Sequence, residues 1–184
     1  MLSIRSEDST DHDAVRQLTV DAFTDCEFGH NGEADLVDLI RSNCNDRLEL
    51  VATEEGVVVG HILFSPVTVR TADGSIHGMG LAPMAVAPNR QRTGIGTALV
   101  ESGIRQLDVN GCLFVVVLGH RRFYPRFGFQ PAAMHRLSHG FKGISQDIFF
   151  VNLLDESLAR SIVNGTAIYR PEFGLQRDST GVVE

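Results

Sequence analysis

The chain has 184 residues, of which 43% are hydrophobic, and this predicts a single globular domain with a sizeable core. Its formal net charge of -7 argues against broad nucleic-acid binding, which needs clustered Lys and Arg side chains to neutralise phosphates. No segment approaches the roughly 20 apolar residues of a membrane span, and the acidic N-terminal stretch is not typical of a targeting signal. We therefore expect a cytoplasmic protein with neither nucleic-acid nor membrane partners.

Cysteine and histidine usage predicts no metal cofactor. Cys26, Cys44 and Cys112 are far apart and form no C-x-x-C pair. This spacing favours a reducing compartment over a disulfide framework or a zinc site. The histidines show no pattern of metal ligands that we can identify.

The first half of the chain predicts a strand, two helices and a meander of three strands. Residues 2–7 alternate weakly, and apolar residues then recur at helical spacing over residues 8–23 and 33–43. The loop between these helices holds Glu27, His30 and Glu33, which makes it a candidate substrate rim. Extended patterns joined by tight turns follow, two strands over residues 48–70 and a third over 75–86.

The second half begins with a strand-helix-strand unit. The helix ends at Asn110-Gly111, and the apolar run 112–119 predicts a buried strand. Because a helix of crossover length separates the strands 75–86 and 112–119, the two should be parallel neighbours. We then expect a short helical segment and turn over 120–129, a strand over 147–154, a short helix or turn over 156–163 and an extended segment over 165–174. Residues 175–184 predict a mobile tail, which leaves one domain over residues 1–174.

The segment "APNRQRTGIGTALV", residues 87–100, lies at the strand-to-helix turn of this unit. Such a turn presents unpaired backbone N–H groups and the positive end of the helix dipole, which attract anions. Gly94 and Gly96 allow a ligand to approach closely, and Arg90 and Arg92 can add positive charge from the sides. The spacing excludes a nucleotide-triphosphatase P-loop and lacks the third glycine of a dinucleotide fingerprint. A nucleotide or sugar-phosphate binder of another kind stays an alternative.

Two motifs in register resemble one known superfamily. Gln91-x-x-Gly94-x-Gly96 resembles the pyrophosphate loop Q/R-x-x-G-x-G/A of the GCN5-related N-acetyltransferase (GNAT) superfamily, and "FYPRFGF" resembles its Y-x-x-x-G-F pattern one strand later. The order of elements agrees over about residues 2–154. The segments "GEADLVDLIR", "RFYPRFGFQPA" and "GTAIYRPEFG" look like the bacterial YhbS-like branch of predicted acetyltransferases. The resemblance implies a mixed α/β fold, with flanking helices and a twisted, mostly antiparallel central sheet that has one parallel, splayed strand pair.

The resemblance also implies acetyl-CoA as co-substrate of an N-acetyltransferase that acts on a primary amine. The pantetheine arm is expected to pair with free backbone groups near Met84, Ala85 and Val86, and Pro83 just ahead fits a bulge that starts the splay. The other expected cofactor contacts are Gln91, Arg92, Thr93, Gly94, Ile95, Gly96, Thr97, His120, Phe123 and Tyr124. His120 belongs here because this chain has "GHRRF" where an Asn often contacts the cofactor in the superfamily.

Direct attack of an amine on a thioester needs a proton acceptor and a hydrogen-bond donor for the departing thiolate. Tyr124 is the expected general acid, because it is the tyrosine of the Y-x-x-x-G-F pattern and a phenol donates without being charged at rest. The sequence leaves the identity of the general base open. Many relatives place a Glu on the strand that ends at Val86, whereas this strand offers only His77. Glu33, Glu27, His30 and a water chain are the alternatives.

The acceptor is an unidentified small-molecule or peptide amine. An acidic chain favours cationic acceptors such as polyamines, aminoglycosides or Lys-containing peptides through long-range steering. A homodimer is compatible with the resemblance, although no sequence feature decides it. Because the strand before the loop carries no carboxylate from Ser75 to Val86, a non-catalytic acyl-CoA-binding or regulatory module of the same fold is the alternative function.

Overall fold

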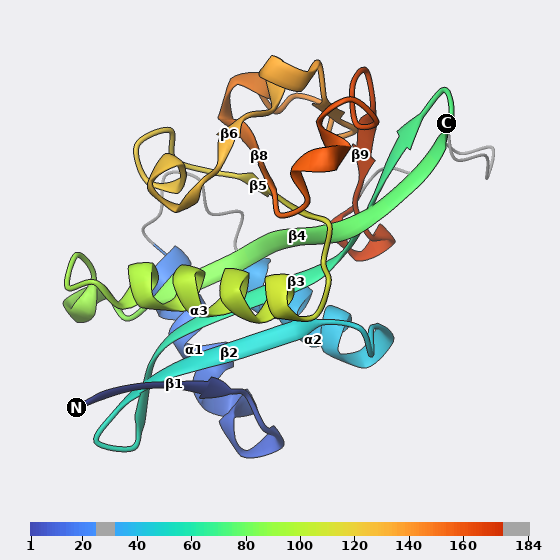
Figure 1. Cartoon of the computed structure of the whole chain (residues 1–184). Helices are drawn as coiled ribbons and strands as arrows, with labels where there is room; N and C mark the ends of the chain where they lie inside the picture. Colours follow the sequence, from blue (N-terminus) through green and yellow to red (C-terminus); the bar gives the residue numbers. More distant parts are fainter. Residues whose placement is uncertain (25–31, 175–184) are drawn as a thin grey trace.

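A computed structural model describes residues 1–24 and 32–174, in which one nine-stranded sheet carries the helices (Figure 1). The strands are β1 (Leu2–Ser6), β2 (Leu48–Glu54), β3 (Val57–Thr71), β4 (Gly74–Val86), β5 (Phe114–Leu118), β6 (Gln130–Pro131), β7 (Ser138–His139), β8 (Phe149–Leu153) and β9 (Thr166–Ile168). The helices are α1 (His12–Phe23), α2 (Glu33–Asn43) and α3 (Ile95–Val109). No helix in this part of the chain is long and apolar enough to cross a membrane.

The sheet has the order β1-β2-β3-β4-β5-β8-β6, with β9 on β3 and β7 on β9. Strands β2, β3 and β4 form the predicted antiparallel meander, and β4 and β5 form the predicted parallel pair. Strand β1 extends the meander by pairing antiparallel with β2. The mixed, mostly antiparallel fold is therefore confirmed. The two-residue pairing of β7 with β9 is also parallel and was not predicted. Residues 165–174, predicted to be extended, form β9 only over 166–168, because Pro171 opens a short 3₁₀ helix.

Helices and loops cover the two faces of the sheet. Along β3, Phe64 packs with Leu99 of α3, whereas its neighbour Leu63 packs with Val15 of α1 and Ile40 of α2. Successive side chains of a strand point to opposite faces, so α3 lies on one face and α1 with α2 on the other. Figure 1 shows α3 crossing the front of the sheet. β5 is apolar throughout because both of its faces are buried.

A cluster of charged side chains joins α2 to the sheet. Glu49 of β2 accepts hydrogen bonds from Arg41 at 2.6 and 2.9 Å and from Arg47 at 2.9 Å. The Nε2 atom of the buried His61 lies 2.9 Å from the same carboxylate and donates to it, because a carboxylate only accepts. Burial opposes ionisation of Glu49, but the hydrogen bonds from His61, Arg41 and Arg47 prevail and lower its pKa to about 2. The cluster therefore holds an ionised carboxylate inside the fold.

Replacing Glu49 should destabilise the fold in a pH-dependent way. We expect Glu49→Gln to lower the free energy of unfolding at neutral pH by about 2 kcal/mol, because Arg41 and Arg47 lose a charged acceptor. The pKa of Glu49 is about 2 in the fold against 4.5 ordinarily, so its stabilisation is present above about pH 4.5 and is lost as the pH falls toward 2. The difference between the two proteins should shrink over that range in urea unfolding.

Asp35→Asn is the matched control for this prediction. Asp35 also pairs with an arginine, Arg16, but its side chain is 68% exposed. Exposed pairs contribute below about 1 kcal/mol, so this variant should unfold almost as the wild type does. If both variants lost the same free energy of unfolding, the buried cluster would stabilise the fold no more than an exposed ion pair does, and the prediction would be wrong.

Candidate active site

The strands β4 and β5 pair over three residues and then separate. Register partners are Met79 with Val115, Gly80 with Val116 and Leu81 with Val117. Next to Leu81, the register between β3 and β4 shifts, so that Leu63 of β3 faces both Ala82 and Pro83 of β4. This bulge bends β4, and no described strand pairs with its β5 side beyond Leu81. Figure 1 shows the two strands diverging, as the family resemblance implied, and the bulge includes Pro83 as expected.

The loop after β4 turns sharply into α3. Arg92 has φ 62°, and Gly94, the N-cap of α3, has φ 95°, a left-handed conformation that favours glycine. The Gly94 carbonyl accepts the N–H of Ala98 at 3.0 Å, so the helix ladder begins there. The N–H groups of residues 95–97 precede the ladder and point out of the helix end, where the dipole is positive. This end of α3 attracts anions.

Side chains of the loop partly stabilise the loop itself. Gln91 Nε2 donates to the Val86 carbonyl at 3.3 Å, and Thr93 Oγ1 donates to the Arg90 carbonyl at 2.6 Å. Arg90 forms an ion pair with Glu54 of β2, so its charge is partly neutralised there, contrary to the prediction that it flanks an anion. Arg92 is exposed, so its side chain is accessible to an anion at this loop. The Val86 carbonyl, predicted to be free, already accepts one hydrogen bond.

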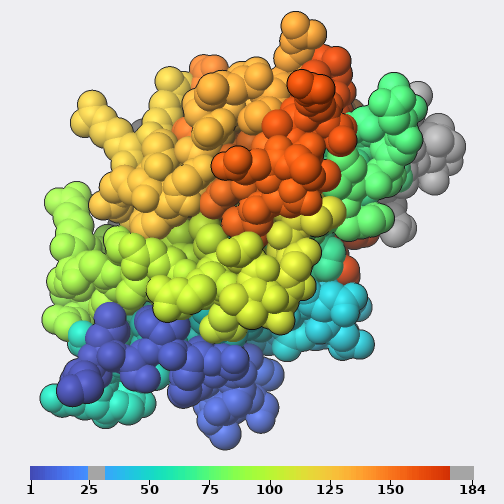
Figure 2. All heavy atoms as spheres, in the orientation of Figure 1, coloured from blue at the N-terminus to red at the C-terminus, as the bar shows by residue number. Residues whose placement is uncertain are grey.

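Gly96 lies where the parts of the site meet. A Cβ atom built on Gly96 would lie 3.6 Å from Met84 Cε and from Phe123 Cζ, and 3.8 Å from Val86 Cγ2. These are ordinary van der Waals distances, so packing within the protein does not itself require glycine here, and the missing side chain leaves a hollow. The start of α3, the free end of β4 and the segment after β5 thus enclose one cradle. Figure 2 shows the loop before α3 adjoining the segment after β5 on one face.

Tyr124 lies beside Phe123 and opens the 3₁₀ helix Tyr124–Phe127. Its ring packs edge-on against Phe123, with centroids 5.1 Å apart, and against Phe129 at 5.5 Å. The ring also covers Gly119, where a Cβ atom would lie 2.2 Å from Tyr124 Cε2. Burial raises the pKa of Tyr124 well above its ordinary value, so the phenol stays neutral and can donate. The carbonyl of His120 accepts the Phe123 N–H at 3.0 Å and so shapes this turn, while the His120 residue is exposed.

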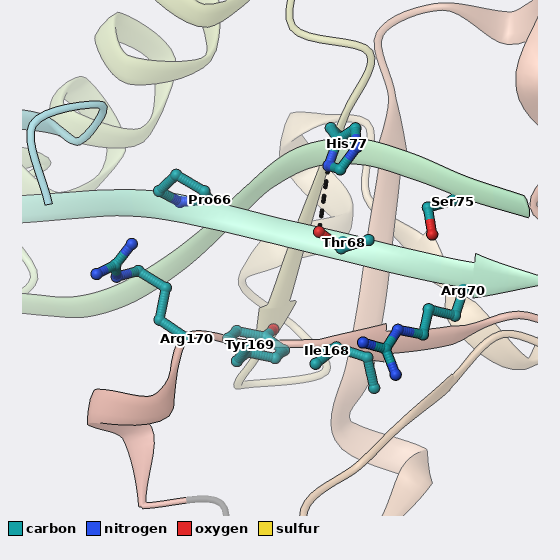
Figure 3. Close-up of a pocket in the computed structure, with 8 residues that line it drawn as sticks. All are labelled: Pro66, Thr68, Arg70, Ser75, His77, Ile168, Tyr169 and Arg170. Carbon is teal, nitrogen blue, oxygen red and sulfur yellow. Dashed lines mark hydrogen bonds between the residues drawn. The ribbon is translucent and has the colours of Figure 1, made fainter. Parts of the chain in front are cut away.

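The structure does not bring His77 to this cradle. His77 is exposed on β4, with Nδ1 3.2 Å from Thr68 Oγ1, and lines an open pocket of about 430 Å³ together with Arg70 and Arg170 (Figure 3). It precedes Leu81 by four residues, or about 13 Å of strand, in the direction away from the gap. The sequence suggested His77 as a base because it is the one ionisable side chain of this strand.

The other predicted bases belong to the region between α1 and α2. Glu33 begins α2 and lines a pocket of about 110 Å³ with residues of α1. Glu27 and His30 lie outside the described residues. Within residues 1–24 and 32–174, no group of three or more His, Cys, Asp and Glu side chains is placed to hold a metal ion.

Comparison with known proteins agrees with this geometry. Residues 12–129 match the model of the acetyltransferase (GNAT) family. The uncharacterized N-acetyltransferase YjhQ of Escherichia coli K12 is 41% identical over 128 residues, which cover 68% of each chain. The uncharacterized N-acetyltransferase YhbS of the same strain is 36% identical over 155 residues, covering 84% of this chain and 90% of YhbS. The chain therefore belongs to the GNAT acetyltransferase family and is an acyltransferase.

Two solved structures extend the similarity over nearly the whole chain. Escherichia coli YhbS in complex with CoA has a TM-score of 0.84 at 32% identity, covering 94% of this chain and 92% of that one. A GNAT family acetyltransferase from Brucella melitensis in complex with acetyl-CoA has a TM-score of 0.77 at 31% identity, covering 94% of this chain and 98% of that one. The resemblance read from the two motifs is thus confirmed for the family, and the one read from the three further segments is confirmed for the branch.

Valine at position 94 should block the anion site with little effect elsewhere. We expect Gly94→Val to weaken acetyl-CoA binding more than tenfold, or about 1.4 kcal/mol, in titration calorimetry, because the loop can no longer approach a pyrophosphate closely. Gly111→Val is the matched control, since Gly94 and Gly111 have φ of 95° and 76° and both have open space around a built Cβ. Both variants should lose similar stability, and only the first should lose affinity. Equal affinities in the two variants would show that this loop is not the phosphate site.

Proposed function

We propose that the chain transfers the acetyl group of acetyl-CoA to a primary amine by direct attack. The observation that carries this proposal is the cradle at Gly96, which joins a strand edge with no partner among the described strands to a helix end that attracts anions. The first suits the amides of a pantetheine arm, and the second suits a pyrophosphate. YhbS with CoA and the Brucella melitensis enzyme with acetyl-CoA support the same assignment.

Each part of the cradle has its own task in holding acetyl-CoA. The backbone of residues 84–86 would pair with the pantetheine arm as a further strand does. The N–H groups of Gly94, Ile95, Gly96 and Thr97 would bind the pyrophosphate, with Arg92 adding charge and with Thr93 and Gln91 fixing the loop. Ile95 is buried, so its contribution comes from the backbone. Phe123 would pack on the arm near Gly96, and the exposed His120 would reach its outer part.

Acetyl-CoA supplies an activated thioester, and the protein must then manage two protons. The nitrogen of a neutral amine forms a bond to the carbonyl carbon as the carbon–sulfur bond breaks and its electron pair leaves on sulfur. Tyr124 donates its hydroxyl proton, or a hydrogen bond, to that sulfur. A base takes the proton that the amine loses. We assign this task to the α1–α2 side, to Glu33 in the described residues, with Glu27 and His30 as alternatives.

The acceptor proposed here is a cationic amine in its resting state, since the net charge of -7 attracts such molecules over long range. Polyamines, aminoglycosides and Lys-containing peptides therefore form the first substrate panel, with free-thiol release from acetyl-CoA as the signal. Silence over the panel while acetyl-CoA still binds tightly would contradict transfer to this class of amine. It would instead favour a binding or regulatory role.

Removing the Tyr124 hydroxyl should slow the reaction without affecting cofactor binding. We expect Tyr124→Phe to lower kcat about 100-fold and to leave the Kd for acetyl-CoA unchanged, because the ring still packs on Phe123 and Phe129. Since burial raises the pKa of Tyr124 above 10.0, its ionisation should not reduce wild-type activity near that pH. Thiol release measured across pH tests both points, and an unchanged kcat in the variant would rule Tyr124 out as the acid.

A further inference from the structure

The second tyrosine of the chain is buried with an unsatisfied hydroxyl. Tyr169 follows β9 directly and is 4% exposed. Its ring packs against Phe141 at 5.0 Å and Phe173 at 5.3 Å between centroids. The hydroxyl has no hydrogen-bond partner among the described residues. A buried hydroxyl left unpaired is costly, so this position calls for a partner that the described residues do not supply.

The ring of Tyr169 extends across the sheet to the inner end of the gap between β4 and β5. Antiparallel pairing of β9 with β3 carries Tyr169 to a position beside Val67. From there the ring reaches β4, since a Cβ atom on Gly80 would lie 2.7 Å from Tyr169 Cε1 and 2.7 Å from Val67 Cγ2. Gly80 directly precedes Leu81, the last residue of β4 that pairs with β5. Glycine at position 80 therefore lets the phenol lie where the two strands part.

Tyr124 and Tyr169 approach this point from opposite faces. Tyr124 packs in the apolar cluster under α3 with Val115 and Val117, whereas Tyr169 packs in the cluster on the other face with Val116. Burial raises the pKa of each phenol well above its ordinary value. Both are neutral donors at ordinary pH.

We infer that the Tyr169 hydroxyl donates a hydrogen bond to the carbonyl oxygen of the bound acetyl group. This inference rests on the proposed acetyl transfer. A thioester under attack gains negative charge on two atoms, the sulfur and the carbonyl oxygen. Tyr124 serves the sulfur from the α3 face, and Tyr169 serves the oxygen from the other. A buried donor that is already in position before the reaction stabilises the growing charge without reorganisation.

The carbonyl stretching band of bound acetyl-CoA tests this hydrogen bond without any turnover. Acetyl-CoA labelled with heavy carbon at the carbonyl allows the band to be isolated by difference infrared spectroscopy. In the wild type and in Tyr124→Phe, the band should shift to lower frequency than in water. In Tyr169→Phe the shift should be lost. A shift that persists in Tyr169→Phe would overturn the inference, even if that variant turned over slowly.

Thermal unfolding and kinetics of Tyr169→Phe test the inferred hydrogen bond independently of the infrared band. Tyr169→Phe keeps the ring and removes an unsatisfied hydroxyl, so the free protein should be at least as stable as the wild type in thermal unfolding. Its kcat should fall about 100-fold, as on loss of one oxyanion donor, with the Kd for acetyl-CoA nearly unchanged. If the Tyr169 hydroxyl had only a structural role, Tyr169→Phe would instead have a lower stability and a normal kcat. A raised KM for the amine with normal kcat would place the hydroxyl on the acceptor and contradict the inference.

Failure of the inference and failure of the proposed function give different results. If wild-type protein shows no heat with acetyl-CoA and no thiol release, the proposed function fails. If the wild type binds acetyl-CoA and transfers its acetyl group, but the carbonyl band keeps its shift in Tyr169→Phe, the proposed function stands and the role of Tyr169 fails. Because the chain has two tyrosines and no tryptophan, the fluorescence of Tyr124→Phe comes from Tyr169 alone. Its change on addition of acetyl-CoA should accompany the infrared shift, and an unchanged emission would count against contact.

Discussion

The candidate site depends on one feature of the sheet, namely that the pairing of β4 with β5 ends after three residues. A parallel pair normally uses the backbone groups of both strands, but here the bulge at Ala82 and Pro83 turns β4 away after Leu81. The edge that this leaves can accept a partner of the right shape from outside the chain. The anion-attracting end of α3 lies next to that edge, because the loop between β4 and α3 is short. The location of the cradle, its free hydrogen-bonding edge and its positive charge therefore all follow from one local departure from regular strand pairing.

The rest of the fold keeps this edge in place. β3 supports the free end of β4, since His61 is the register partner of Ala85. His61 is in turn held by Glu49, which Arg41 ties to α2. The charged cluster therefore lies one strand away from the cradle and fixes the strand on which the cradle rests. The cost of desolvating these charges is offset by their hydrogen bonds, most of which go to the Glu49 carboxylate.

Much of the fold could be predicted because the relevant signals are local. Apolar periodicity separated helices from strands, and Pro83 with the glycines of the loop marked the place where β4 departs from the sheet. Long-range pairings gave no such signal. Arg90 looked available for an anion until the structure placed Glu54 beside it, and the cluster around Glu49 draws on α2, β2 and β3. His77 was named from its residue type, whereas its distance along β4 follows only from where the pairing ends.

The role of the site could be predicted only in part for the same reason. Tyr124 belongs to the segment that resembles the superfamily's Y-x-x-x-G-F pattern, so the resemblance pointed to it. Tyr169 reaches the same point from the other end of the chain, and only the pairing of β9 with β3 brings it there. The short β6 and β7 strands, two residues each, lack the length that a periodic pattern needs.

Hydrogen exchange of the backbone amides tests most directly whether the gap between β4 and β5 holds the pantetheine arm. Acetyl-CoA should slow exchange in residues 82–86 and in residues 94–97 together. Adenosine diphosphate, which has the pyrophosphate but no pantetheine, should slow exchange in residues 94–97 alone. Protection of neither segment by acetyl-CoA, or equal protection of both by the nucleotide, would contradict this arrangement.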